Sequence, residues 1–168
     1  MVRLSCQQQS RLFLFSCRKL GHDVITPDQI RDAWGWTGLR PKDVIETNAF
    51  GNMIVKDDHG TYWRICPEDL SCTVIATTDE DFCRLRDDPV FVRNWDVSLW
   101  VEAARARLGD IPPERTYCLK VPAPLGGRYE SANFGTISRL ELLSASGDMA
   151  RQIHDLPDGA QVELRLSN

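Results

Sequence analysis

The chain has 168 residues, of which 42% are hydrophobic and 26% charged, and its 24 acidic side chains outnumber the 20 basic ones. This length suits one domain with a single core. A net charge of −4 argues against a dedicated nucleic-acid binder, which usually has a basic excess. Because no apolar run approaches the roughly 20 residues that a membrane-spanning helix needs, we expect no membrane partner either.

The six cysteines are scattered along the chain and include no Cys-x-x-Cys pair. In a chain with enough apolar residues for a core, this distribution favours reduced thiols and a cytoplasmic location. Cys66 and Cys72 are one pair that neighbouring strands could bring together. A disulfide between them is the less favoured alternative.

The first 22 residues need separate treatment. The segment from Arg11 to Cys17 suggests the apolar core of a signal peptide, but it is too short and is closed by Arg18 and Lys19. No small-residue cleavage site follows. We interpret residues 1–22 as an N-terminal extension, disordered or poorly packed, and assign the domain to residues 23–168.

A helix is predicted to begin after Thr26. Thr26 can cap the helix, Pro27 suits the first helical position, and Gln29 completes a capping box. Gly35 should end the helix. The segment from Pro41 to Thr47 should then lead into the next element.

Residues 50–77 predict a three-stranded antiparallel meander, around which the rest of the fold is organised. On the first strand Met53 and Val55 share one face, and on the second strand Trp63 and Ile65 share one face. These four side chains form one apolar surface that needs a cover. The third strand alternates through Cys72, Val74 and Ala76.

Turn signals separate the strands of the meander. Asp57 can start a turn by bonding its own backbone, and Gly60 can take a positive φ at no steric cost. Pro67 ends the second strand, because proline offers no N–H to the ladder.

Two helices should follow the meander. A short one begins after Thr78 with three acids, which complement the positive end of the helix dipole, and it ends by Asp88-Pro89. A longer helix is predicted from about Val90 to Leu108. Its apolar face at helical spacing consists of Val92, Trp95, Leu99, Ala103 and Ala106.

The last third of the chain predicts a strand at Tyr117–Val121 and then an exposed loop with paired glycines, Gly126 and Gly127. This pair lacks the context of a phosphate-binding motif. An extended segment, a helix and a final strand are predicted at Asn133–Ile137, Arg139–Asp155 and Val162–Leu166. The fold class is therefore α+β: a single domain with an antiparallel sheet of about five to six strands and helices packed against it.

No residue constellation indicates an enzyme. The histidines, His22, His59 and His154, have no carboxylate or thiol at a spacing typical of a catalytic triad or a zinc site. The acidic runs at Asp57-Asp58, Asp79 to Asp81 and Asp87-Asp88 are typical of turns, helix starts and solvated surface. We therefore predict a binding protein, not an enzyme, with no cofactor and no metal.

Two blocks of the sequence carry a family resemblance. The first is N-A-F-G-N-M-I-V-K-D-D-H-G-T-Y-W-R-I-C-P-E-D-L, at residues 48–70, and the second extends from residue 119 towards the C-terminus. They resemble the C-terminal domain of type VI secretion immunity proteins, which protect cells from DNase toxins and whose domain was long catalogued as one of unknown function. The second block matches the family at Lys120, Leu125, Gly126, Gly127, Tyr129, Asn133, Gln152, Ile153, Asp155, Leu156, Pro157, Asp158 and Gly159.

The resemblance spans roughly residues 26–166 and implies a cytoplasmic immunity protein that binds and neutralises a cognate toxin, a nuclease, encoded nearby. An acidic inhibitor suits this role, because a nuclease needs a basic surface for its phosphate substrate. The predicted partner-binding residues lie on the hairpin tip, the turn after the second strand and the Gly-Gly loop: Asp57, Asp58, His59, Glu68, Asp69, Arg128 and Tyr129. The alternative is a small-molecule or nucleotide-sensing domain with the Gly-Gly loop and Trp63 at its pocket.

Overall fold

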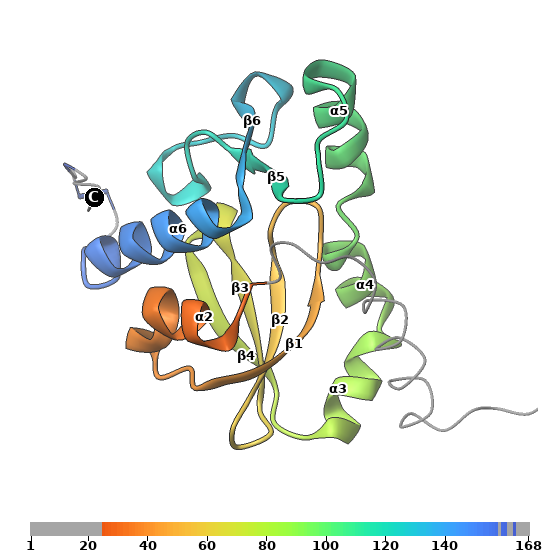
Figure 1. The fold of residues 1–168 in the computed structure, drawn as a ribbon, viewed down its shortest axis with the longest axis vertical. Coiled ribbons are helices and arrows are strands. Elements are labelled where there is room, and N and C mark those ends of the chain that lie inside the picture. The colour runs from red at the N-terminus through yellow and green to blue at the C-terminus, as the bar shows by residue number, and fades with distance from the viewer. Residues whose placement is uncertain (1–24, 158, 161–162, 164–168) are drawn as a thin grey trace, which may run out of the picture.

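The computed structural model describes residues 25–157, 159–160 and 163, and in this part of the chain the fold is α+β. Six strands form two antiparallel sheets instead of one. The larger sheet has the order β1-β2-β3-β4 and the smaller sheet pairs β5 with β6. The predicted fold class is therefore confirmed, with the strands divided between a four-stranded and a two-stranded sheet (Figure 1).

The bounds of the strands are β1 (Pro41–Thr47), β2 (Met53–Asp57), β3 (Tyr62–Cys66), β4 (Ser71–Ala76), β5 (Arg115–Leu119) and β6 (Phe134–Ser138). The α-helices are α2 (Pro27–Trp34), α3 (Asp79–Arg86), α4 (Pro89–Trp95), α5 (Ser98–Leu108) and α6 (Arg139–Ile153). Short 3₁₀ turns connect them: η1 (Gly35–Thr37), η2 (Pro67–Asp69), η3 (Ala123–Leu125) and η4 (Ser131–Asn133).

One face of the larger sheet is covered by α2 and α6, as the apolar surface of the meander predicts. Met53 pairs with Ile65 and Val55 pairs with Trp63 across β2 and β3. These side chains pack into one core cluster with Trp34 of α2 and other residues of α2 and α6. A Cβ at Gly147 of α6 would lie 2.4 Å from the carbonyl oxygen of Ala33. The two helices therefore pack closely because this position is glycine.

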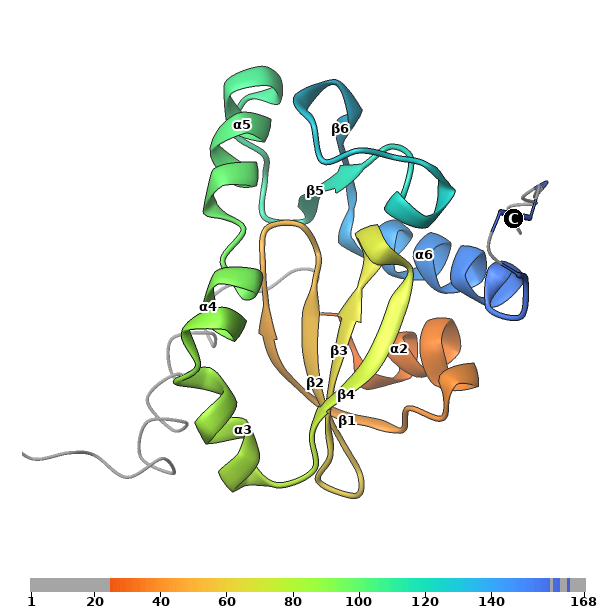
Figure 2. The same ribbon diagram turned by 180° about the vertical axis from the view of Figure 1, so that it is seen from behind.

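The other face of the larger sheet is covered by α3 and α4 (Figure 2). The ring of Tyr62 stacks on that of Phe82 with 4.0 Å between the centroids. Ile54 and Ala76 complete this second cluster, and Trp95 of α4 packs against it. Since both faces are covered, the four-stranded sheet forms the middle layer of the molecule.

The smaller sheet has its own aromatic cluster with α5. Phe50, Tyr117 and Phe134 are buried there with Ala104. The Phe134 ring meets the Phe50 ring edge-on at 5.4 Å between the centroids. Thus α3, α4 and α5 run in sequence along one side of both sheets (Figures 1 and 2).

Local start signals are confirmed. Both oxygens of the predicted capping box at Thr26 and Gln29 are bonded, and Thr78 caps α3 through the backbone N–H of Asp81. The predicted helix at Arg139–Asp155 is α6, and the extended segment after Asn133 is β6.

Two predictions about elements are wrong. The segment Pro41–Thr47, expected only as a lead-in, is strand β1, paired with β2 through two irregularities. The long helix predicted from Val90 to Leu108 is two helices, because Asp96 leaves the helical region and its side chain accepts a hydrogen bond from the N–H of Ser98. The break reorients the second half, so the expected apolar residue Leu99 is 77% exposed.

The N-terminal extension 1–22 and the predicted strand at Val162–Leu166 lie outside the described residues, apart from residue 163. Cys66, Cys72 and Cys118 are free thiols, so Cys66 and Cys72 do not form the disulfide considered as an alternative. No helix in the described residues is long and apolar enough to cross a bilayer.

Candidate partner-binding site

The hairpin tip between β2 and β3 carries three of the predicted contact residues, and they differ in exposure. Asp57 is 5% exposed, and its carboxylate accepts hydrogen bonds from Trp63 Nε1 at 2.9 Å and from the N–H groups of His59 and Thr61. Burial opposes ionisation, but these bonds outweigh it and hold the pKa of Asp57 below its usual range. Asp57 therefore organises the turn, and only Asp58 and His59 face solvent there.

The turn after β3 places Glu68 inside the protein. Its Oε1 accepts a 2.6 Å hydrogen bond from Asn52 Nδ2, and its Oε2 has no partner among the described residues. Arg64 donates to the Oδ1 of Asn52 and lies over the ring of Trp95, 5.6 Å from its centroid. Burial raises the pKa of the Glu68 carboxyl, and the Asn52 bond offsets part of that effect. This chain of polar groups ties β2 and β3 to α4.

Asp69, in contrast, is exposed and is bonded to the Gly-Gly loop. The hydroxyl of Tyr129 donates to its Oδ1 at 2.7 Å, and the thiol of Cys66 donates to its Oδ2 at 3.2 Å. The Tyr129 ring also packs against Trp100 of α5, with 4.9 Å between the centroids. Burial and the bond to Asp69 raise the pKa of Tyr129. The structure thus brings together Asp69 and Tyr129, which are 60 residues apart in sequence.

The Gly-Gly loop is shaped by residues that carry the family resemblance. A Cβ at Gly127 would lie 1.7 Å from the carbonyl oxygen of Val121, and Gly126 has φ +88°. Asn133 accepts from the N–H of Val121 and donates to the carbonyls of Val121 and Arg128. Arg128 itself is exposed. These matched positions therefore hold the loop in shape.

The seven predicted residues do not form one surface. The Asp57–His59 tip precedes β3, whereas Glu68 and Asp69 follow it, so the two groups lie at opposite ends of a five-residue strand (Figure 1). A strand of that length spans about 15 Å. Glu68 and Asp57 are buried, which leaves Asp58, His59, Asp69 and Arg128 as the exposed members, with Tyr129 half-buried.

A charged surface that the sequence reasoning missed lies on α3, α4 and the start of α5. Residues 79–102, the acidic segment, contain seven Asp or Glu and three Arg, leaving 17 of the 24 acidic and 17 of the 20 basic side chains for the rest of the chain. The whole net charge of −4 therefore lies in this segment. Counting charge in windows along the sequence would have found it.

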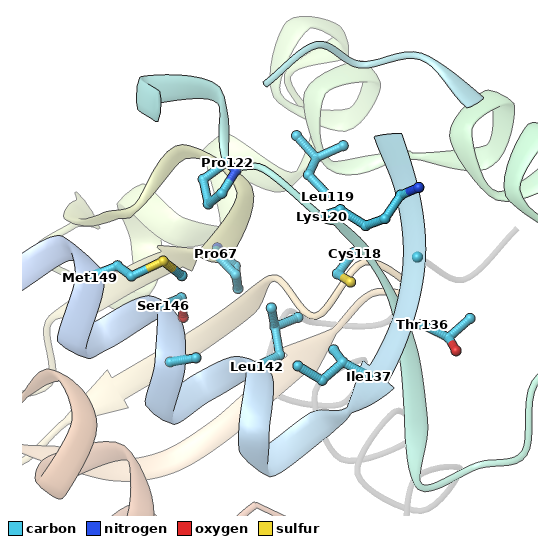
Figure 3. Close-up of a pocket in the computed structure, with 12 residues that line it drawn as sticks. Pro67, Cys118, Leu119, Lys120, Pro122, Thr136, Ile137, Leu142, Ser146 and Met149 are labelled. Atoms are coloured by element: carbon cyan, nitrogen blue, oxygen red, sulfur yellow. The ribbon is translucent and has the colours of Figure 1, made fainter. Parts of the chain in front are cut away.

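A groove of about 360 Å³ lies between α6 and the smaller sheet. Leu142, Ser146 and Met149 of α6 form one wall, and Pro67 and Pro122 lie at the opposite side (Figure 3). The groove also adjoins Cys118, Leu119, Lys120, Gly135, Thr136, Ile137 and Ala145. Trp63, which the alternative hypothesis placed at a pocket, does not line it.

Within the described part of the chain, no group of three or more His, Cys, Asp or Glu side chains is arranged to hold a metal ion. The thiol of Cys72 is half-buried beside Thr37, and burial raises its pKa to about 11. That thiol is therefore protonated at neutral pH and is a poor nucleophile.

No protein-family model matches the chain, and no curated protein matches it in sequence. Among solved structures, it is similar to Atu4351 from Agrobacterium tumefaciens, with a TM-score of 0.52 and 13% sequence identity. The match covers 84% of this chain and 77% of that chain. At this level of identity the similarity shows the fold alone.

Proposed function

We propose that this chain is a cytoplasmic immunity protein, not an enzyme, that binds a cognate type VI secretion toxin, a DNase, and neutralises it by protein–protein contact. The two sequence blocks at residues 48–70 and 119–162 support the family. The observation that carries the proposal is the uneven charge, since the acidic segment 79–102, which forms α3, α4 and the start of α5, holds the whole net charge of the chain.

The charge distribution suits an inhibitor of a nuclease. A DNase needs a basic surface to hold the phosphates of its substrate. An acidic surface is attracted to such a site over long range, which raises the association rate. Protection of a cell requires tight binding, so we expect a nanomolar dissociation constant or better, about −12 kcal/mol.

The roles of the matched residues are consistent with this function. Gly127 and Asn133 fix the Gly-Gly loop through contacts within the chain, and Tyr129 joins the loop to η2. Residues of this kind preserve a fold while the partner surface changes with each toxin. The contact surface is then formed by other residues.

Co-expression with the toxin-like reading frame beside this gene tests the proposal. The expected result is a stoichiometric complex in gel filtration and rescue of growth in cells that express the toxin. An unrelated acidic protein of similar size, which should neither co-elute nor rescue, is the control. Toxicity without rescue, together with no co-elution, would contradict the proposal for that toxin.

The groove beside α6 favours a second candidate function, a small-molecule-binding domain. Its volume of about 360 Å³ is within the range of small ligand pockets, and Leu142 and Met149 give it apolar walls. The ligand would then be a small, largely apolar molecule. A bound molecule in native mass spectra, with no interaction with the neighbouring toxin-like protein, would favour this function over the first.

A further inference from the structure

The helices of the acidic segment expose large apolar side chains within one short stretch. Val90 is 55% exposed, Val92 is 47% exposed and Leu99 is 77% exposed. Single exposed apolar residues are common on protein surfaces. Val90 and Val92 are two positions apart on α4 and therefore point to different sides of that helix. This leaves Leu99, the most exposed of the three, as the apolar anchor of a contact surface on α4 and α5, which lie along one side of the molecule (Figure 2).

The backbone under these side chains is held in place. Trp95 at the end of α4 donates from its Nε1 to Glu46 of β1 at 3.0 Å, and its carbonyl accepts from Asn48. Trp100 of α5 packs edge-on against Phe134. A rigid surface loses little conformational entropy when a partner binds, so this face is preorganised for docking.

The starts of α4 and α5, next to these exposed residues, are also fixed. Asp88 caps α4 by accepting from the N–H of Val90 at 2.7 Å, and Asp96 accepts from the N–H of Ser98 at 3.0 Å. The exposure of Leu99, the second residue of α5, is therefore a property of an ordered helix start. Its side chain projects from a defined position.

The charges around Leu99 and α4 identify the partner. Asp96 and Glu102 are exposed three positions before and after Leu99, and Asp87 and Asp88 are exposed just before α4. The exposed Arg93 of α4 is the single cation among residues 87–102, so the surface stays acidic. An apolar anchor with a charged rim is the usual anatomy of a tight protein interface. The complementary surface is basic and offers an apolar recess, which is the chemistry expected of the phosphate-binding face of a nuclease.

We propose that the outward face of α4 and the start of α5 is the docking surface for the toxin, with Leu99 as the central apolar anchor and the surrounding carboxylates facing the toxin's basic DNA-binding surface. This inference rests on the proposed function and adds the surface and the mode of inhibition. The immunity protein and DNA then compete for the same face of the toxin.

The chain offers a matched control for the anchor. Leu99 and Leu140 are each the second residue of a helix, α5 and α6, and both are exposed, at 77% and 43%. The variants Leu99→Arg, Leu99→Asp and Leu140→Arg are compared with the wild type for binding to the purified product of the neighbouring toxin-like reading frame. Circular dichroism confirms that each variant is folded.

We expect Leu99→Arg and Leu99→Asp to raise the dissociation constant at least tenfold and Leu140→Arg to leave it within twofold. If Leu99→Asp also loses binding, Leu99 acts as an apolar anchor. A purely electrostatic contact with a basic partner would not be weakened by an added negative charge. A short DNA duplex should reduce complex formation with the wild type in a concentration-dependent manner.

The outcomes distinguish this inference from the function on which it rests. No complex with the wild-type protein contradicts the immunity function itself. A wild-type complex that Leu99→Arg and Leu99→Asp form equally well overturns the docking surface and leaves the function standing. A loss of binding in Leu140→Arg alone would also overturn the docking surface on α4 and α5, and would place the contact on α6.

Discussion

The hydroxyl of Tyr129 lies 2.7 Å from Oδ1 of Asp69 and donates a hydrogen bond to it, joining the Gly-Gly loop to the turn that follows β3. Asp69 also accepts from the thiol of Cys66, so both of its carboxylate oxygens are engaged within the chain. The two residues were predicted separately as partner contacts. The bond gives each a structural role that is testable without any partner.

Tyr129→Phe removes that bond and keeps the ring against Trp100. A hydrogen bond to a charged group contributes about 1.5–3 kcal/mol, and water can replace part of it at an exposed carboxylate. We expect the free energy of unfolding to fall by about 1–2 kcal/mol, measured by urea denaturation. Arg128→Ala, on the same loop, should change it by less than about 0.5 kcal/mol. Equal stability of Tyr129→Phe and the wild type would contradict the prediction.

Alanine substitutions at Gly127 and Gly126 test two different reasons for glycine, a steric clash at Gly127 and backbone strain at Gly126. A Cβ at Gly127 would lie 1.7 Å from a backbone oxygen, whereas a Cβ at Gly126 meets nothing within 4 Å and suffers only from the φ of +88°. Gly126→Ala should cost about 1–2 kcal/mol, the penalty for a left-handed residue. Gly127→Ala should cost about 3 kcal/mol or displace the loop, at the upper end of the usual cost of overpacking. Thermal unfolding of both variants measures the difference, and equal melting temperatures would refute it.

Asp57→Asn tests whether the buried carboxylate organises the hairpin. The amide cannot accept from Trp63 and His59 and Thr61 together, so we expect a loss of about 1–3 kcal/mol at pH 7. The folded pKa of Asp57 is lowered, so its stabilisation is present above its ordinary pKa of 3.8 and is lost as pH falls through the folded value. The gap between wild type and Asp57→Asn should therefore shrink in acid.

Asp58→Asn is the control for that experiment, because Asp58 is exposed beside His59 and caps nothing. Chemical denaturation at pH 7 and at acid pH should show little difference between Asp58→Asn and the wild type. If the two variants behaved alike at pH 7, the bonds of Asp57 would contribute nothing to folding.

Local signals predicted much of the fold. The capping box at Thr26, the cap at Thr78 and the Asp57–Gly60 turn depend on residues within four positions, and all are present. The alternation of Met53 and Val55 predicted the covered face, because a strand alternates its sides strictly. Strand β1 has no such alternation, and its extended form depends on pairing with β2.

The candidate site was less predictable because burial depends on distant partners. Glu68, next to proline and aspartate, has the local pattern of a surface turn, yet Asn52, 16 residues earlier, holds it inside. Asp96 and Ser98 form the break between α4 and α5. The apolar residues before and after the break have helical spacing, and this spacing predicted one continuous helix. That error hid the exposure of Leu99, which became visible only once the two helices were separate.

Glu68→Gln tests the consequence of burying that carboxyl. Its folded pKa is raised above the ordinary value of 4.5, first by burial, so the native state favours the protonated acid. Below pH 4.5 both states bind the proton and the group has no effect; as pH rises from there towards the folded pKa, the unfolded state ionises first and the wild type loses stability. Glutamine resembles the protonated acid and does not titrate. The stability of Glu68→Gln relative to the wild type should therefore rise from pH 4 to pH 7 in urea titrations.

Glu114→Gln, at an exposed position, should show no such trend. A constant difference between Glu68→Gln and the wild type across this range would mean that Glu68 is ionised in the folded protein, with its second oxygen solvated.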